Sequence, residues 1–176
     1  YDTPAIDAEE LRRWIDDGVC SPSSTMSVNV SPRQLSDTNF PAIVSEALTR
    51  SGVSPQLLWL EVTESVMIAE PDLALATLRR LRSLGVRVAL DDFGTGYSSL
   101  SLLQKFPLQR IKIDRAFVHG VADNPNDRSL VRTIVAMGRS LGLDMVAEGV
   151  ESVHQLQVLS DLGCNKAQGY LISHPV

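Results

Sequence analysis

The chain has 176 residues, of which 44% are hydrophobic and 21% are charged. This length and composition suit one globular domain and exclude an intrinsically disordered chain. The 16 Lys and Arg residues stand against 21 Asp and Glu residues, a formal net charge of -5. An acidic chain of this kind is a poor partner for a nucleic acid polymer, whose phosphate backbone needs a basic face.

The sequence also limits where the protein works. No apolar run approaches the roughly 20 residues that a membrane-spanning helix needs, and there is no signal-peptide pattern at the start. The two cysteines, Cys20 and Cys164, lie far apart and are typical of reduced thiols, so we expect a cytoplasmic protein. Because the chain begins at Tyr1 rather than at Met, we expect it to be a piece of a longer protein.

Six short apolar runs, most of them rich in β-branched residues, are predicted to be strands. They cover residues 26–30, 57–61, 86–90, 110–113, 145–147 and 165–168. Four amphipathic patterns lie between them and are predicted to be helices that end at a glycine. These cover residues 41–52, 71–85, 127–142 and 152–163. Ser152 and Gln155 have the spacing of a capping box.

Alternating strands and helices predict an α/β fold with parallel strands, either an open doubly wound sheet or a (β/α) barrel of the TIM type. Polar groups stand at the carboxyl end of every predicted strand, and in a barrel all these ends face one mouth. They are Asn29, Glu61, Asp91, Asp92, Lys112, Asp114, Glu148 and Gln168. We therefore favour the barrel. A closed barrel usually has eight strands, so two strands would lie before Tyr1.

Several carboxylates in one mouth repel one another unless a cation lies between them. Carboxylate and amide oxygens suit Mg²⁺ or Mn²⁺ better than zinc, and no histidine stands at a strand end. The adjacent Asp91 and Asp92 could serve two ions about 4 Å apart, the arrangement that cleaves phosphodiesters. Lys112 could orient the attacking water and offset charge in the transition state.

Other interpretations of these residues remain open. A single strand-end carboxylate is most often a helix cap, and Asp114 could equally cap the next helix or enter the site. Glu64 and Glu151 could orient neighbouring loops or be ordinary first-turn carboxylates. The Gly94 and Gly96 pair could belong to a dinucleotide-binding turn, but the third glycine is absent, so we favour a loop that closes over the site.

Six motifs make the sequence similar to the EAL family of cyclic-di-GMP phosphodiesterases. In chain order they are Ser27-Val-Asn-Val-Ser31, Leu60-Glu-Val-Thr-Glu-Ser65, Asp91-Asp-Phe-Gly-Thr-Gly-Tyr97, Lys112-Ile-Asp114, Ala147-Glu-Gly-Val-Glu151 and Gln168-Gly-Tyr170. The resemblance implies a modified TIM barrel with one antiparallel strand. It also implies metal-dependent hydrolysis of cyclic di-GMP to the linear dinucleotide pGpG, and a homodimer.

The resemblance further implies a role for each site residue. Asn29, Glu61 and Asp91 resemble the ligands of a first metal ion, and Asp91 with Asp92 those of a second. Lys112 resembles the lysine that contacts the attacking water, and Glu148 the glutamate of the metal–water network. Gln168 resembles a substrate contact near a guanine. Glu64 resembles the anchor of the loop from Gly94 to Gly96, and Glu151 a support for the site.

The chain also departs from the family. The namesake Glu-Ala-Leu motif supplies a further metal ligand from an early strand, and it is not found ahead of the strand at 26–30. We interpret Glu9 to Trp14, its closest counterpart, as the helix before that strand; the alternative is a motif joined across a gap. Residues 1–176 would then be one domain without its first strands, with a sensory or cyclase domain possible upstream. Loss of one ligand leaves open an inactive receptor that binds cyclic di-GMP. His174 stands where the family usually has arginine.

Overall fold

The computed structural model describes residues 3–94, 100–164 and 166–174. Six strands in these ranges form one sheet in which every neighbouring pair is parallel. The strands follow one another across the sheet in chain order. They are β1 (Met26–Asn29), β2 (Leu58–Thr63), β3 (Arg87–Phe93), β4 (Arg110–Ile113), β5 (Asp144–Ala147) and β6 (Lys166–Ala167).

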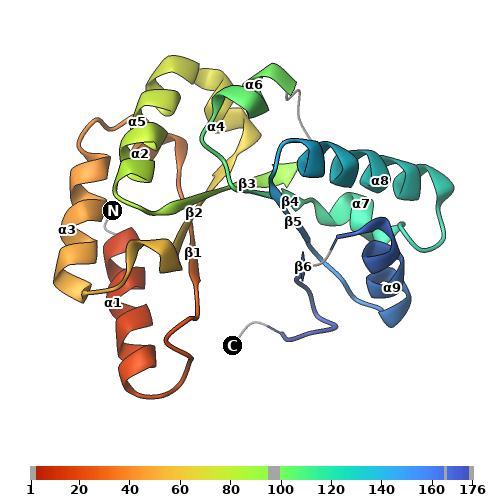
Figure 1. The fold of residues 1–176 in the computed structure, drawn as a ribbon, viewed down its shortest axis with the longest axis horizontal. Coiled ribbons are helices and arrows are strands. Elements are labelled where there is room, and N and C mark those ends of the chain that lie inside the picture. The colour runs from red at the N-terminus through yellow and green to blue at the C-terminus, as the bar shows by residue number, and fades with distance from the viewer. Residues whose placement is uncertain (1–2, 95–99, 165, 175–176) are drawn as a thin grey trace.

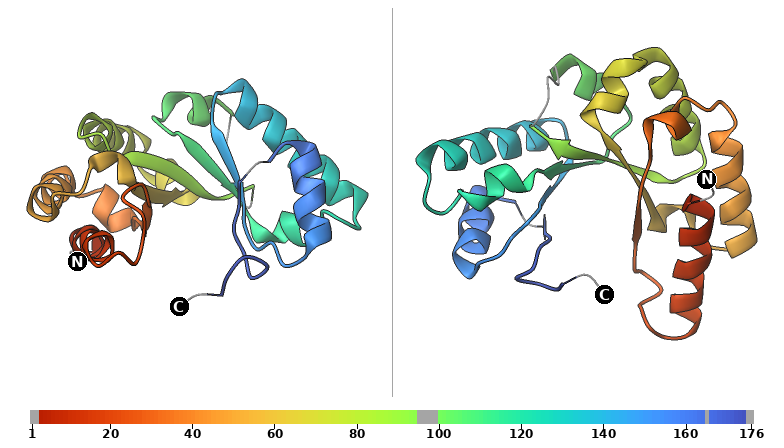
Figure 2. Two further views of the ribbon diagram at one scale, coloured as in Figure 1. Left: turned by 60° about the horizontal axis from the view of Figure 1, so that its bottom comes forward. Right: turned by 180° about the vertical axis from the view of Figure 1, so that it is seen from behind.

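Helices connect the strands and cover the outer face of the curved sheet (Figure 1). They are α1 (Thr3–Asp16), α2 (Pro32–Leu35), α3 (Phe40–Ser51), η1 (Pro55–Leu57), α4 (Glu64–Ala69), α5 (Pro71–Ser83), α6 (Leu100–Lys105), α7 (Arg115–His119), α8 (Pro125–Ser140) and α9 (Val153–Leu162). Figure 2 shows the sheet curling so that β1 and β6, its two edges, both border the concave side. None of the described helices combines the length and the apolar character that crossing a membrane requires.

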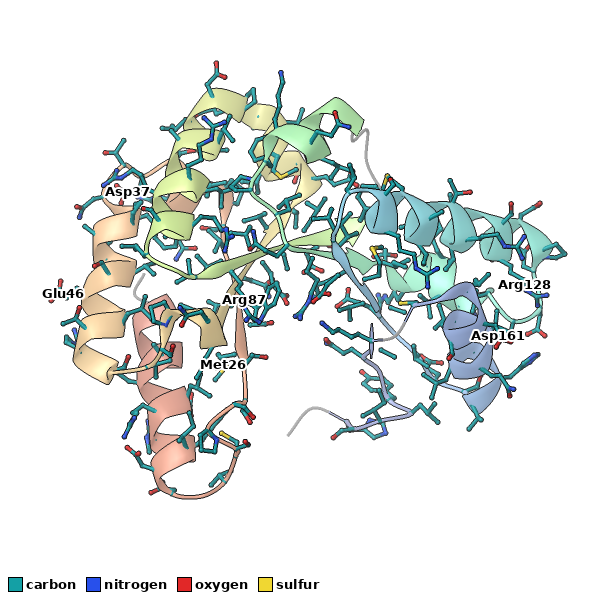
Figure 3. All side chains as sticks on the ribbon, in the orientation of Figure 1. Met26, Asp37, Glu46, Arg87, Arg128 and Asp161 are labelled. Atoms are coloured by element: carbon teal, nitrogen blue, oxygen red, sulfur yellow. The ribbon has the colours of Figure 1, made fainter. Side chains whose placement is uncertain are left out.

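The two faces of the sheet differ because side chains alternate along a strand. In β2, Leu58, Leu60 and Val62 belong to the apolar core beneath the helices. Trp59 and Glu61 alternate with them and therefore face the concave side. Figure 3 shows Arg87 on this concave side as well, whereas Glu46 on α3 and Asp161 on α9 are exposed on the outer helices. The core thus lies between sheet and helices, and the concave face carries the polar groups.

The sequential strand order decides between the two architectures. A doubly wound sheet reverses its strand order at a switch point, whereas these six strands progress in one direction as in a barrel. The barrel prediction is therefore confirmed as a curled half-barrel, and the dinucleotide-binding sheet is wrong. The antiparallel strand that the resemblance implies is not among the six described strands.

The predicted element boundaries hold to within three residues, and the largest difference affects the site. Ser152 caps α9 in a capping box with Gln155, as predicted, and Gly52 and Gly163 are the C-terminal caps of α3 and α9. Strand β3 continues to Phe93, three residues beyond the predicted end at residue 90. That extension carries the Asp91-Asp92 pair within the strand rather than after it. The short helices α2, α4, α6 and α7 were not predicted.

Candidate functional site

Lys112 lies at the centre of a cluster of carboxylates on the concave face. Its Nζ is 2.6 Å from Oε2 of Glu61 and 2.9 Å from Oδ1 of Asp91. The same Nζ is 2.8 Å from Oε1 of Glu148. The four residues come from β2, β3, β4 and the residue after β5, so parallel strands that are far apart in sequence bring them to one edge.

The surroundings of Lys112 keep it protonated. Burial alone lowers the pKa of a lysine, but hydrogen bonds to Glu148, Glu61 and Asp91 outweigh it and raise the pKa above the ordinary value of 10.5. The side chain is 7% exposed, so water screens these ion pairs little. Lys112 therefore carries its positive charge at neutral pH in the metal-free protein.

A bulge in β3 places both members of the Asp91-Asp92 pair at the mouth. Adjacent residues of a regular strand point to opposite faces. Here the register with β4 shifts between Leu90 and Phe93, and Asp92 has a φ of 52°, a conformation that aspartate adopts more readily than most residues. The bulge therefore turns two neighbouring carboxylates toward one site.

Asp91, Asp92 and Glu148 form a group that fits a divalent cation. Each offers a carboxylate oxygen, and these oxygens lie within 4.8 Å of one another. Burial, then the charges of Asp91 and Asp114, raise the pKa of Asp92. Burial also raises the pKa of Glu148, although Lys112 opposes the change. Four carboxylates, those of Glu61, Asp91, Asp92 and Glu148, lie around the single ammonium of Lys112, and an all-oxygen set suits Mg²⁺ or Mn²⁺.

Two predicted ligands lie beside this group. Glu61 is buried and bonded to Lys112, and Asn29 is its register partner on β1. Asn29 is exposed at the carboxyl end of its strand. Asp114 caps α7, since its Oδ1 accepts a hydrogen bond of 2.7 Å from the Ala116 N–H, and it also lines a cavity next to Asp92. Both interpretations offered for Asp114 therefore apply.

Glu64 connects the end of β3 to the start of α4. Its Oε1 accepts a hydrogen bond of 2.9 Å from the backbone N–H of Gly94, as expected for a loop anchor, and Glu64 also stands in the first turn of α4. Gly94 has a φ of 104°, and a Cβ there would lie 2.6 Å from the ring of Phe117. Only glycine fits this position without rearrangement. Gly96, the other half of the predicted loop, lies outside the described residues.

A cavity of about 260 Å³ opens next to the carboxylate group. Its lining includes Asp92, Glu148, Glu151, Gln168, Arg115 and Tyr170. Gln168 and Glu151 thus both border this cavity, and their roles as a substrate contact and a supporting residue stay predictions. Arg115 and Tyr170 were not assigned a role from the sequence. Arg115 directly follows the strand-end Asp114, and Tyr170 follows Gln168 by two positions, which is the signal that could have found them.

The tripeptide Glu46-Ala47-Leu48 must be distinguished from the family's namesake motif. Although its letters are Glu-Ala-Leu, it lies in α3, where Ala47 and Leu48 pack in the core. Figure 3 shows Glu46 on the outer surface, away from the concave face. Residues 9–14 lie in α1, the helix before β1, as predicted, and Glu9 forms an ion pair with Arg50 of α3. Neither segment supplies a ligand at the mouth.

Comparisons with known proteins agree with this geometry. The family model described as "EAL domain" matches residues 7–175. The bifunctional diguanylate cyclase/cyclic di-GMP phosphodiesterase MucR of Pseudomonas aeruginosa is 41% identical over 167 residues, which cover 95% of this chain. The chain spans only 24% of the length of MucR.

Solved structures are similar over almost the whole chain. The PaMucR phosphodiesterase in complex with c-di-GMP gives a TM-score of 0.91 at 40% identity, covering 98% of this chain and 69% of that one. Klebsiella pneumoniae BlrP1, in a manganese and cyclic di-GMP complex, gives 0.85 at 28% identity over 96% of this chain and 43% of that one. The family match and the half-barrel together lead to one assignment: the chain belongs to the EAL-domain family.

Proposed function

We propose that the chain hydrolyses cyclic di-GMP to linear pGpG with the help of divalent metal ions. The observation that carries this proposal is the meeting of Glu61, Asp91, Asp92, Lys112 and Glu148 at one edge of the sheet. The names of MucR and of the PaMucR complex support the substrate, because both relatives are described as acting on or binding this dinucleotide.

The chain's own carboxylates would hold the metal. Asn29, Glu61 and Asp91 would bind one Mg²⁺ or Mn²⁺ ion, and Asp91 with Asp92 a second. Such ions would lower the pKa of a bound water and neutralise charge on the phosphodiester. The crystallised manganese complex of BlrP1 supports this choice of ion.

Lys112 and Gln168 would then act on the water and the substrate. The ammonium of Lys112 would orient the attacking water and offset the negative charge that develops on phosphorus oxygens. Gln168 would hold a base from the wall of the neighbouring cavity. Glu64 would keep the end of β3, and with it Asp91 and Asp92, in position through Gly94.

The test is conversion of cyclic di-GMP by the purified protein, followed by anion-exchange chromatography in Mg²⁺ or Mn²⁺. We expect pGpG to form, to disappear on addition of EDTA, and to fall by about 10³-fold or more in Asp91→Asn, because the loss of a metal ligand removes several kcal/mol of transition-state stabilisation. Asp161→Asn, an exposed change on α9, is the matched control and should keep wild-type turnover.

Two results would contradict the proposal. Turnover that survives in Asp91→Asn would place the chemistry elsewhere. Tight binding of cyclic di-GMP without metal and without product would instead make the domain a receptor of the same fold.

A further inference from the structure

The concave face carries a cluster of cations that the proposed catalytic site does not use. Arg87 of β3, Arg110 of β4 and Lys166 of β6 face this side, and Trp59 of β2 lies among them. Figure 3 shows Arg87 in this position. The four residues lie nearer the amino ends of their strands than the carboxylates of the mouth do, and we call them the basic floor.

The two arginines of the basic floor converge on one aromatic ring. The Cζ atom of Arg110 is 3.5 Å from the ring centroid of Trp59, and the Cζ atom of Arg87 is 5.3 Å from it. Burial lowers the pKa of Arg110, the charges of Asp144 and Glu61 oppose this change, and the charge of Arg87 adds to it. The two guanidinium groups are thus close enough to repel each other.

Acidic side chains only partly balance these cations. Oδ2 of Asp144 is 3.7 Å from Nη2 of Arg110, and the same oxygen pairs with Lys166. Among the residues that the structure describes, Arg87 forms no ion pair. Three cations therefore share one carboxylate, and positive charge remains in excess at the basic floor.

Two buried hydrogen-bond donors also belong to this cluster. Within the described part of the chain, Nε1 of Trp59 and Nε of Arg110 have no acceptor. Burying a donor without an acceptor costs free energy, so such groups are uncommon. The Arg110 side chain is 15% exposed and Arg87 is half-buried, so a ligand can reach both guanidinium groups from the concave side. The basic floor thus offers N–H donors and positive charge, and it needs acceptors that carry negative charge.

We propose that the basic floor is a binding site for a phosphate-type oxyanion, either inorganic phosphate or the phosphate group of a phosphomonoester. A phosphate has more acceptor oxygens than a carboxylate, so it can accept hydrogen bonds from two guanidinium groups and an ammonium at once. The planar donor fork of arginine matches two of these oxygens. This site goes beyond the proposed function and does not depend on it.

The test is titration of the purified protein with inorganic phosphate in EDTA, followed by calorimetry. EDTA removes any metal at the mouth that could itself hold phosphate. The chain has two tryptophans, so in Trp14→Phe the emission reports on Trp59 alone. We expect one phosphate to bind per chain and to change the emission of Trp59. GMP, titrated in the same way, distinguishes the two sources: binding of both ligands assigns a site open to phosphomonoesters, and binding of phosphate alone assigns a site for the free ion.

Two variants with opposite expected effects locate the site. Arg87→Gln should weaken phosphate binding by about ten- to a hundredfold, the loss expected for one charge-assisted contact. Asp144→Asn should tighten it several-fold, because it removes the carboxylate that competes for Arg110 and Lys166. Arg79→Gln, an exposed change on α5, is the matched control for Arg87→Gln and should keep the wild-type affinity.

Three results would overturn the inference. They are no saturable phosphate binding by wild type, an affinity that Arg87→Gln leaves unchanged, and weaker binding in Asp144→Asn. The last result would mean that Asp144 supports the cluster only structurally. Because these measurements use neither metal nor cyclic di-GMP, their outcome is independent of whether the chain hydrolyses that dinucleotide.

Discussion

Lys112 supplies the positive charge that offsets three carboxylates of the site. It is the ammonium that contacts Glu61, Asp91 and Glu148, and it is almost wholly buried. Removing one partner from a buried ionic group leaves the remaining charges unpaired and costs more than an exposed pair could contribute. The structural role of Lys112 and the catalytic role that we propose for it would therefore have the same origin.

We predict that Lys112→Met destabilises the metal-free protein by about 3–5 kcal/mol, because three carboxylates lose their shared cation. Urea unfolding in EDTA measures this, with Lys105→Met, an exposed change in α6, as the control. Mn²⁺ should stabilise the variant more than it stabilises wild type, since the ion replaces the missing charge. Equal stability of the variant and wild type in EDTA would show that these ion pairs contribute nothing.

The raised pKa of Lys112 predicts how the difference in unfolding free energy between wild type and Lys112→Met depends on pH. A group whose pKa rises on folding contributes its full stability below its unfolded pKa, near 10.5, and loses it as the pH rises through the folded pKa. The gap between wild type and Lys112→Met should therefore stay constant from about pH 7 to pH 10. This difference in unfolding free energy should become smaller above about pH 10, where Lys112 loses its proton. It should also become smaller in acid, where the carboxylates take up protons.

At the scale of elements, an interaction between β2 and β4 spans the strand between them. The guanidinium of Arg110 lies 3.5 Å from the ring centroid of Trp59, and that of Arg87 lies 5.3 Å away. The side chain that separates them on β3 is Ala89, which is small and buried. Trp59 and Arg110 each precede a site residue by two positions, so this stack lies directly below the pair of Glu61 and Lys112.

We predict that Arg110→Ala destabilises the protein by about 1–2 kcal/mol, the range for a desolvated cation–π contact. The emission of Trp59 should shift to longer wavelength as water replaces the guanidinium, while Trp14 on α1 is unaffected. Arg79→Ala, on the exposed side of α5, is the matched control. An unchanged spectrum and stability would mean that the stack does not hold β2 and β4 together.

The elements also show what the sequence could predict. Strands and long helices were predicted because apolar runs and glycine ends mark them, as at Ser152 and Gly163. The bulge that turns Asp91 and Asp92 to the same mouth was not predicted, since it depends on pairing with β4 rather than on local sequence. The ion pairs of Lys112 were not predicted for the same reason: the sequence placed Lys112 at one mouth with these carboxylates, but not in direct contact with three of them.

At the scale of the whole molecule, the site depends on every strand of the half-barrel. Its residues come from β1 to β5 and from the segment after β6, and no two neighbouring strands could form it alone. The apolar core that supports them is continuous beneath the helices. Ligand binding at the mouth should therefore stabilise the edge of the sheet at β5 and β6 as well as the centre.

Cys164 can report on that coupling, because it lies between α9 and β6. It is 5% exposed, and burial raises the pKa of its thiol, so it should react with iodoacetamide at pH 8 only after the structure opens. Cys20, in the connection before β1, is less buried and should react quickly.

Mn²⁺ with cyclic di-GMP at about 100 times Kd should slow Cys164 alkylation by about 100-fold, if opening is global and binding stabilises only the folded state. Mass spectrometry of the two cysteine peptides measures both rates in one sample, and the Cys20 rate is the internal control. If the ligand left the alkylation rate of Cys164 unchanged, β6 would open locally, independently of the mouth that it helps to form.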